Sequence, residues 1–179
     1  QINKLKLKIF KVPSGEITNL PYLKYLSGLN GEIILSTGMA NLKETEIALN
    51  ILNKNKKHKI TVMHCNTAYP TPFYDANLRA LETLKKEFGF PIGFSDHTLG
   101  IEASIAAVAM GASIIEKHFT INKRMKGPDH QASLSQNELI SLVKAIRNIE
   151  LAMGTGKKVA TVSEKENINV ARKSIVAKI

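Results

Sequence analysis

The sequence predicts an α/β fold built on a parallel sheet, and three features carry that prediction. Five short apolar runs recur along the chain, helical patterns separate them, and polar residues gather just after each run. None of the runs alternates cleanly between apolar and polar residues, which is typical of strands covered on both faces. Strands that alternate with helices indicate parallel β/α units. Barrels and open α/β sheets both place their sites at the carboxyl ends of such strands.

The predicted strands and helices follow one another along the chain. We expect strands at residues 9–12, 33–35, 60–63, 92–94 and 114–116. Apolar residues at helical spacing predict helices between them. They form two stripes, Ala48, Ile51 and Leu52, then Leu78, Leu81, Leu84 and Phe88. Residues 101–110 are apolar nearly all round, which favours a deeply packed helix.

Capping residues indicate where two of the helices begin. Asn41 is a suitable N-cap for the helix that carries the first stripe. Ser135 and Glu138 form a capping-box pattern at the start of the last long helix. We expect that helix to end at Gly154. Its expected core face consists of Leu139, Leu142, Val143 and Ile146.

Composition and charge narrow the functional classes. A chain of 179 residues can bury one sizeable core, and its net charge of +10 favours anionic ligands. The lysines are not interleaved with aromatic residues, so we expect no nucleic-acid partner. No apolar stretch approaches the ~20 residues of a membrane span and no signal peptide is visible, so we expect a cytoplasmic protein without a membrane partner. The single cysteine, Cys65, excludes an intrachain disulfide and fits a reducing compartment.

Polar residues after the first predicted strand suit an anion. Lys11, Ser14 and Glu16 bring together a cation, a hydroxyl and a carboxylate. Gly15 would let backbone N–H groups approach a phosphate or carboxylate ligand. The alternative is a strand-ending turn with a surface lysine. After the second strand, residues 35–39 combine small hydroxyls with a glycine, which favours plain turn chemistry.

A loop with two prolines follows the third strand. Pro70 and Pro72 make this segment rigid, so that it holds Tyr69 in a fixed place. His64 is expected to be packed or hydrogen-bonded in the wall of the fold. We expect Cys65 to be an inert buried thiol, because no activating neighbour is evident in the sequence.

Two histidines follow the fourth and fifth predicted strands and favour a metal site. His97 and His118 take equivalent positions after neighbouring strands, which lie about 4.8 Å apart in a sheet. We expect their imidazoles to lie within ~8 Å of each other and to share one divalent ion, Mn²⁺ or Mg²⁺. Glu116 should face the same side as His118, as a hydrogen-bond acceptor or a substrate ligand. Asp96 should face away from the site.

A further carboxylate lies in the loop after the fifth strand. Asp129 stands in the sequence Gly-Pro-Asp-His at residues 127–130. Because Gly, Pro and Asp are turn residues, a plain turn is one interpretation. The other is a loop carboxylate that binds the hydroxyls of a polyol.

Taken in order, six segments resemble the bacterial sialic acid synthase family. They are Lys-Val-Pro-Ser-Gly-Glu, Ile-Leu-Ser-Thr-Gly-Met, His-Cys-Asn-Thr-Ala-Tyr-Pro-Thr-Pro, Gly-Phe-Ser-Asp-His-Thr, Glu-Lys-His-Phe-Thr and Gly-Pro-Asp-His. The resemblance implies a (β/α)8 TIM barrel, of which residues 1–155 would cover about the fourth to eighth β/α units. Residues 156–179 would be a linker and the start of a truncated antifreeze-like domain, with its first strand at 171–177. The full-length protein would be a homodimer.

The resemblance also implies an activity. Family members condense phosphoenolpyruvate with an N-acetylated hexose, N-acetylmannosamine or a diacetamido-trideoxy analogue, in a metal-dependent reaction. The products are a nonulosonic acid and phosphate.

Roles for individual residues follow from the same resemblance. His97 and His118 would be the metal ligands, and Glu16 would act with Lys11 near the reacting methylene. The implied phosphoenolpyruvate ligands are Lys11, Ser14, Thr67 and Ser95, with Asn66 as an alternative to Thr67. The other implied substrate ligands are Glu116, and Tyr69 and Asp129 for the sugar.

Two other interpretations compete with this one. A different divalent-metal barrel aldolase or lyase acting on sugar phosphates would not consume phosphoenolpyruvate. Alternatively, the chain is an inactive fragment that acts only as a folded domain.

Overall fold

A parallel sheet forms the centre of the molecule. The computed structural model describes residues 7–55 and 57–173. The sheet has five strands in the order β1-β2-β3-β4-β5. They are β1 (Ile9–Val12), β2 (Glu32–Ser36), β3 (Ile60–Cys65), β4 (Ile92–Asp96) and β5 (Ile114–Lys117). All five predicted strands are confirmed, and four of them run slightly longer than predicted.

The sheet is strongly curled. In a flat sheet, the four steps from β1 to β5 would separate these strands by about 19 Å. Nevertheless, Lys11 on β1 and Glu116 on β5 form an ion pair with 2.7 Å between Lys11 Nζ and Glu116 Oε2. The inner faces of the first and last strands therefore turn toward each other. Within the described residues β1 and β5 each have a neighbour on one side, so the sheet is an open half-barrel.

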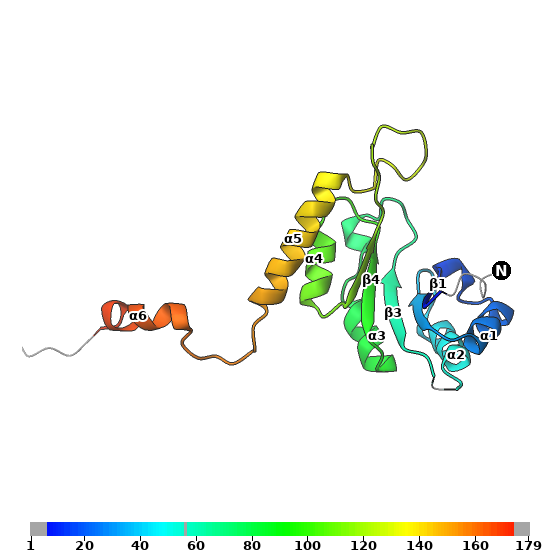
Figure 1. Cartoon of the computed structure of the whole chain (residues 1–179), viewed down its shortest axis with the longest axis horizontal. Coiled ribbons are helices and arrows are strands. Elements are labelled where there is room, and N and C mark those ends of the chain that lie inside the picture. Colours follow the sequence, from blue (N-terminus) through cyan, green and yellow to red (C-terminus); the bar gives the residue numbers. More distant parts are fainter. Residues whose placement is uncertain (1–6, 56, 174–179) are drawn as a thin grey trace, which may run out of the picture.

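Helices cover the outer face of the sheet (Figure 1). The helices on this face are α1 (Leu20–Gly28), α2 (Leu42–Leu52), α3 (Ala80–Phe88) and α4 (Glu102–Ala109), and α5 (Gln136–Ala152) packs on α4. The chain also forms α6 (Val162–Ala171), which lies away from the sheet (Figure 1), and the short 3₁₀ turns η2 (Ser14–Glu16) and η3 (Phe73–Asp75). The core lies between strands and helices, where Leu23, Leu49 and Leu81 pack with Val12 and Leu35. This placement leaves the inner, concave face for the site.

Both predicted helix starts are confirmed. Asn41 Oδ1 accepts a hydrogen bond from the Glu44 backbone N–H at 3.0 Å, and Glu44 Oε2 accepts one from the Asn41 N–H at 2.9 Å. Ser135 and Glu138 form the same reciprocal cap on α5. Lys123 also donates to Glu138 at 2.6 Å. The hydrogen bonds from Lys123 and Ser135 lower the pKa of Glu138 to about 2.

Two expectations about packing need correction. In α4, Ala103, Ser104 and Ala107 are buried, whereas the rest of this apolar helix is half-buried or more exposed. In α5, Leu142 is buried but Val143 is 46% exposed. In both cases α5 packs chiefly on α4, so each helix buries a narrower stripe than its composition offers.

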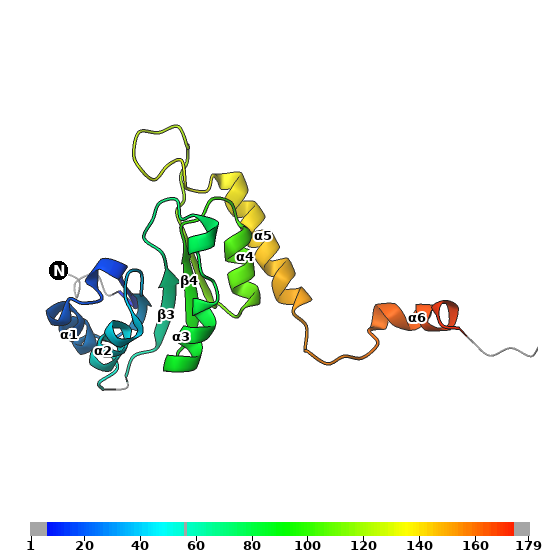
Figure 2. The same ribbon diagram turned by 180° about the vertical axis from the view of Figure 1, so that it is seen from behind.

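The carboxyl-terminal part of the chain extends away from the sheet (Figures 1 and 2). Its helix α6 begins at a third capping box, in which Thr161 and Glu164 exchange hydrogen bonds. This helix was not predicted from the sequence. The strand expected at 171–177 falls mostly outside the described residues, and Ala171 itself ends α6. None of the helices in the described part of the chain is long and apolar enough to cross a membrane.

Candidate functional site

A cavity of about 270 Å³ opens at the carboxyl ends of the strands, on the concave face. Its wall consists of Lys11, Pro13, Ser14, Gly15, Ser36, Cys65, Thr67, Tyr69, Ser95, His97, Glu116 and His118. Every strand contributes a residue, with Lys11 on β1 and Ser36 on β2. On the other three strands, Cys65, Ser95 and Glu116 lie side by side, because they are register partners across β3, β4 and β5. All predicted site residues except Glu16, Asn66 and Asp129 line this cavity. A larger cavity of about 540 Å³ lies between α2 and α3 and contains neither His97 nor His118.

One side of the cavity presents a cation and hydroxyls. Lys11 donates to both carboxylate oxygens of Glu116, at 2.9 and 2.7 Å. Ser14 Oγ accepts a hydrogen bond from the Gly38 backbone N–H at 3.0 Å. A Cβ at position 38 would lie 2.7 Å from Ser14 Oγ, so the close approach of these two segments requires glycine. The segment assigned to turn chemistry thus also forms part of the site wall.

Ser36 is a cavity residue that sequence reasoning missed. It is the last residue of β2 and is 1% exposed. Its Oγ lacks a hydrogen-bond partner among the described residues, which marks it as a group available to a ligand. Its position directly after the predicted strand 33–35 could have identified it, because Ser95 takes the same position after the predicted strand 92–94.

Glu116 is held as a carboxylate. Burial by itself would raise its pKa, but hydrogen bonds from Lys11 and Ser95 outweigh this effect and the pKa lies below its usual value. Ser95 Oγ donates to Glu116 Oε1 at 2.7 Å. Glu116 therefore acts as an acceptor at neutral pH, and it neutralises Lys11 while no other anion is present.

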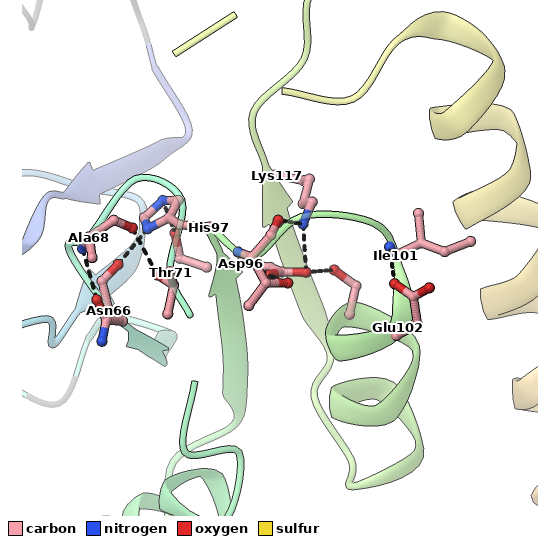
Figure 3. A network of polar contacts seen from close by, with 11 residues as sticks. Asn66, Ala68, Thr71, Asp96, His97, Ile101, Glu102 and Lys117 are labelled. Carbon is pink, nitrogen blue, oxygen red and sulfur yellow. Dashed lines mark hydrogen bonds and ion pairs between the residues drawn. The ribbon is translucent and has the colours of Figure 1, made fainter. Parts of the chain in front are cut away.

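The two histidines converge on the opposite side of the cavity. The ring centroids of His97 and His118 lie 5.2 Å apart, with the ring planes at 82°. The predicted convergence within ~8 Å is therefore confirmed. His97 Nδ1 pairs with the Asn66 carbonyl oxygen, which accepts its proton and leaves Nε2 with a lone pair (Figure 3). Burial lowers the pKa of His97, and the nearby His118 adds to this effect, so His97 is neutral at pH 7.

Tyr69 covers both imidazoles. Its ring centroid lies 4.1 Å from that of His97 and 5.1 Å from that of His118. The loop is fixed to the histidine segment, since the Thr71 N–H donates to the His97 carbonyl at 2.8 Å. Burial raises the pKa of Tyr69, and nearby acidic groups add to this effect. The phenol therefore keeps its proton and can donate to a ligand hydroxyl.

His64 lies outside the cavity wall, next to Cys65, which is part of it. His64 Nε2 bonds to the Ala76 carbonyl at 2.8 Å, which matches the expected structural hydrogen bond. Burial lowers the pKa of His64. Cys65 is buried, and its Sγ lies 3.9 Å from His97 Nδ1.

Three predicted residues lie outside the cavity wall. Glu16 accepts a hydrogen bond from Asn19 Nδ2 at 2.6 Å. The Asn66 side chain holds its own loop, with Oδ1 accepting from the Ala68 N–H at 2.8 Å, while Thr67 faces the cavity. Asp129 Oδ2 lies 3.9 Å from His118 Nδ1 at the open edge of the site.

The donor set fits a divalent ion whose coordination is completed by other molecules. His97 offers a neutral imidazole whose Nε2 lies 3.4 Å from Ser95 Oγ, and His118 lies beside it. In the described residues, no group of three or more His, Cys, Asp or Glu side chains could hold a metal by itself. Water or substrate oxygens would therefore have to fill the remaining positions, as in sites that leave coordination open for a substrate.

Comparison with known proteins gives a consistent result. The sequence profile described as the NeuB family matches residues 1–158. The N,N'-diacetyllegionaminic acid synthase of Campylobacter jejuni is 60% identical over 99% of this chain and 54% of its own length. The enzyme of the same name from Legionella pneumophila is 42% identical over 96% of this chain and 49% of its own length. This chain thus spans about half the length of the curated relatives it matches.

Structural similarity supports the same grouping. The crystal structure of an N-acetylneuraminic acid (sialic acid) synthetase from Leptospira borgpetersenii, in complex with citrate, superposes with a TM-score of 0.85. The sequence identity is 39%, and the match covers 94% of this chain and 59% of that chain.

Proposed function

The chain belongs to the NeuB family, and from this premise we propose that it forms part of the catalytic barrel of a sialic acid synthase. The reaction condenses phosphoenolpyruvate with an N-acetylated hexose, N-acetylmannosamine or a diacetamido-trideoxy analogue, to a nonulosonic acid and phosphate. The observation that carries the proposal is one cavity with a lysine and hydroxyls on one side and two converging imidazoles on the other. The alternative of another metal-dependent aldolase is not favoured, because the relatives are named as synthases of this class.

The cationic side suits phosphoenolpyruvate. Lys11 would exchange Glu116 for the phosphate or carboxylate of this substrate, and Ser14, Ser36, Thr67 and Ser95 would supply hydroxyl contacts. Charge-assisted hydrogen bonds of this kind are about twice as strong as neutral ones. Holding the substrate there would place its methylene carbon toward the histidines.

The imidazole side suits the aldehyde of the open-chain sugar. His97 and His118 would hold Mn²⁺ or Mg²⁺, which would polarise the aldehyde oxygen as a Lewis acid when bound. Tyr69, which stays protonated, would donate to a sugar hydroxyl. Asp129, at the open edge beside His118, would accept from others.

The covalent steps follow from these placements. The methylene carbon of phosphoenolpyruvate attacks the aldehyde carbon, a C–C bond forms, and the former aldehyde oxygen takes a proton. Water then adds at the carbon that carries the phosphate ester, and phosphate leaves with cleavage of the C–O bond. We assign Glu16 to orientation or proton transfer at the rim, and Lys11 to stabilisation of the developing charge.

The architecture of the whole protein belongs to the same proposal. We infer that the half-barrel is the fourth to eighth units of a (β/α)8 barrel ending at residue 155. Residues 156–179 would link it to an antifreeze-like domain of a homodimer. The single cysteine fits a cytoplasmic location.

The test is a coupled assay on the full-length protein. Phosphate release should require phosphoenolpyruvate, the N-acetylated hexose and a divalent ion together, and mass spectrometry should detect the nonulosonic acid in equal amount. Chelation should abolish both signals, and added Mn²⁺ should restore them. Formation of pyruvate without phosphate release would instead indicate an aldolase and overturn the proposal.

A further inference from the structure

A buried ion pair joins the ends of β4 and β5 directly behind the two histidines. Asp96 is the last residue of β4, Lys117 is the last residue of β5, and the two are register partners. Lys117 Nζ lies 2.9 Å from Asp96 Oδ2, and the two side chains are 4% and 0% exposed. As the sequence predicts, Asp96 faces away from the cavity; it points toward α4 (Figure 3).

The pair belongs to a hydrogen-bond network that includes the residues on both sides of His97 in the chain. Asp96 Oδ1 accepts from the backbone N–H and the hydroxyl of Thr98, each at 2.8 Å. Asp96 Oδ2 also accepts from Ser104 Oγ on α4 at 2.5 Å. Lys117 donates in addition to the Thr98 carbonyl at 2.6 Å. Both chain neighbours of His97 are therefore fixed, and so is the residue that precedes His118.

General stability does not explain why charges stand at these two positions. Apolar residues of similar volume often stabilise a fold as well as a buried ion pair or better, because two charges must be desolvated. Among the ion pairs of the described residues, this is the one with both side chains almost fully buried. Its distinctive property is directional: it defines both the separation and the register of the two strand ends.

We propose that Asp96 and Lys117 are positioning residues, which fix the separation of His97 and His118 and thereby set the affinity of the two-histidine site for a divalent cation. The inference rests on the proposed function, because it takes the two imidazoles as metal ligands. The pair acts through the backbone, since neither side chain lines the cavity. Removing it leaves both histidines in place but lets their spacing vary.

The test measures Mn²⁺ binding to the full-length protein by electron paramagnetic resonance, in which the signal of free Mn²⁺ falls as the ion binds. The variant is Asp96→Leu with Lys117→Met, which removes both charges at once and leaves neither unpaired. The matched control is Glu32→Gln with Lys59→Met, an exposed ion pair that joins β2 to the start of the β3 segment at the other end of the sheet. We expect the Kd for Mn²⁺ to rise about tenfold or more in the first variant. The control should stay within about twofold of the wild type.

Two further measurements separate positioning from folding. Far-UV circular dichroism and the Kd for phosphoenolpyruvate without metal should be unchanged in the Asp96→Leu, Lys117→Met variant. If that variant does not fold, Asp96→Asn with Lys117→Gln, which removes both charges but keeps polar groups at both positions, carries the same test, with the same expected rise in Kd. An unchanged Kd for Mn²⁺ in a folded variant overturns the positioning role. If the wild type binds no Mn²⁺, or His97→Ala binds it equally well, the proposed metal site itself fails and this inference fails with it.

Discussion

Two lysine–carboxylate ion pairs lie on opposite faces of the same sheet and differ in their exposure to solvent. The inner pair, Lys11 and Glu116, spans the cavity between β1 and β5, and its side chains are 32% and 42% exposed. The outer pair, Lys117 and Asp96, joins β5 to β4 behind the sheet, with side chains 4% and 0% exposed. The N–O distances are similar, 2.7 and 2.9 Å, so the contrast lies in the surroundings.

This difference in exposure determines which charged side chains a ligand can bind. Water and a substrate can reach the inner pair, so an anion can displace Glu116 from Lys11. The outer pair has no access to solvent, and every oxygen of Asp96 already accepts hydrogen bonds. The inner pair is therefore exchangeable, whereas the outer pair is permanent.

The largest effect is expected when the 179-residue chain is studied by itself, because the inner pair depends on the curl of the sheet. We expect the 179-residue chain by itself to be inactive and to self-associate or aggregate, because in the described residues β1 and β5 each have a neighbouring strand on one side and so present an open sheet edge. Size-exclusion chromatography with light scattering and a phosphate-release assay on the same sample test this. A stable monomer with turnover near that of the full-length protein would contradict the prediction.

The second-largest effect is expected when one of the two residues of the outer pair is replaced. Asp96→Ala leaves Lys117 buried without its partner, and we expect a loss of about 3–5 kcal/mol in the free energy of unfolding. Urea unfolding followed by circular dichroism measures the loss. Lys59→Ala, which disrupts an exposed pair with Glu32, is the control and should lose no more than about 1 kcal/mol. Equal losses in the two variants would refute the distinction between buried and exposed pairs.

The third effect is expected when Lys11, the cation of the inner pair, is replaced. In the full-length protein, Lys11→Ala should weaken phosphoenolpyruvate binding by about 1.5–3 kcal/mol, roughly 10- to 150-fold in KM, because a charge-assisted hydrogen bond is lost. The KM for the sugar should change far less. Steady-state kinetics with each substrate varied in turn gives both values. Unchanged KM and kcat for phosphoenolpyruvate would rule out this role for Lys11.

The smallest effect concerns the pH dependence of the inner pair. The folded-state pKa of Glu116 lies below its usual value of 4.5. Stability from this pair is therefore present above that value and is lost as the pH falls through the lowered pKa. Because both side chains are partly exposed, Glu116→Gln should reduce the free energy of unfolding by about 1 kcal/mol or less at pH 7. Unfolding curves of both proteins should converge in acid; a difference that grows in acid would show the sign to be wrong.

The sequence by itself determined the five strands, four of the six helices in the described residues and much of the site. Apolar runs located all five strands, because strands buried on both faces need them. An N-cap residue located the start of α2 and a capping box located the start of α5, since both patterns are local, and a capping box at Thr161 and Glu164 could have located α6. His97 and His118 were expected to converge because side chains that follow neighbouring parallel strands meet at one edge.

Only the tertiary structure decided what depends on the curl and on packing across the chain. Lys11 and Glu116 are 105 positions apart, and their contact exists because the sheet bends β1 toward β5. The structure also places Ser36 in the cavity wall and Glu16 and Asn66 outside it. Val143 is exposed although it follows the helical pattern, because α5 packs chiefly on α4 and buries a narrow stripe. Local patterns encode hydrogen bonds and burial within an element, whereas contacts between distant strands depend on the curvature that the whole sheet adopts.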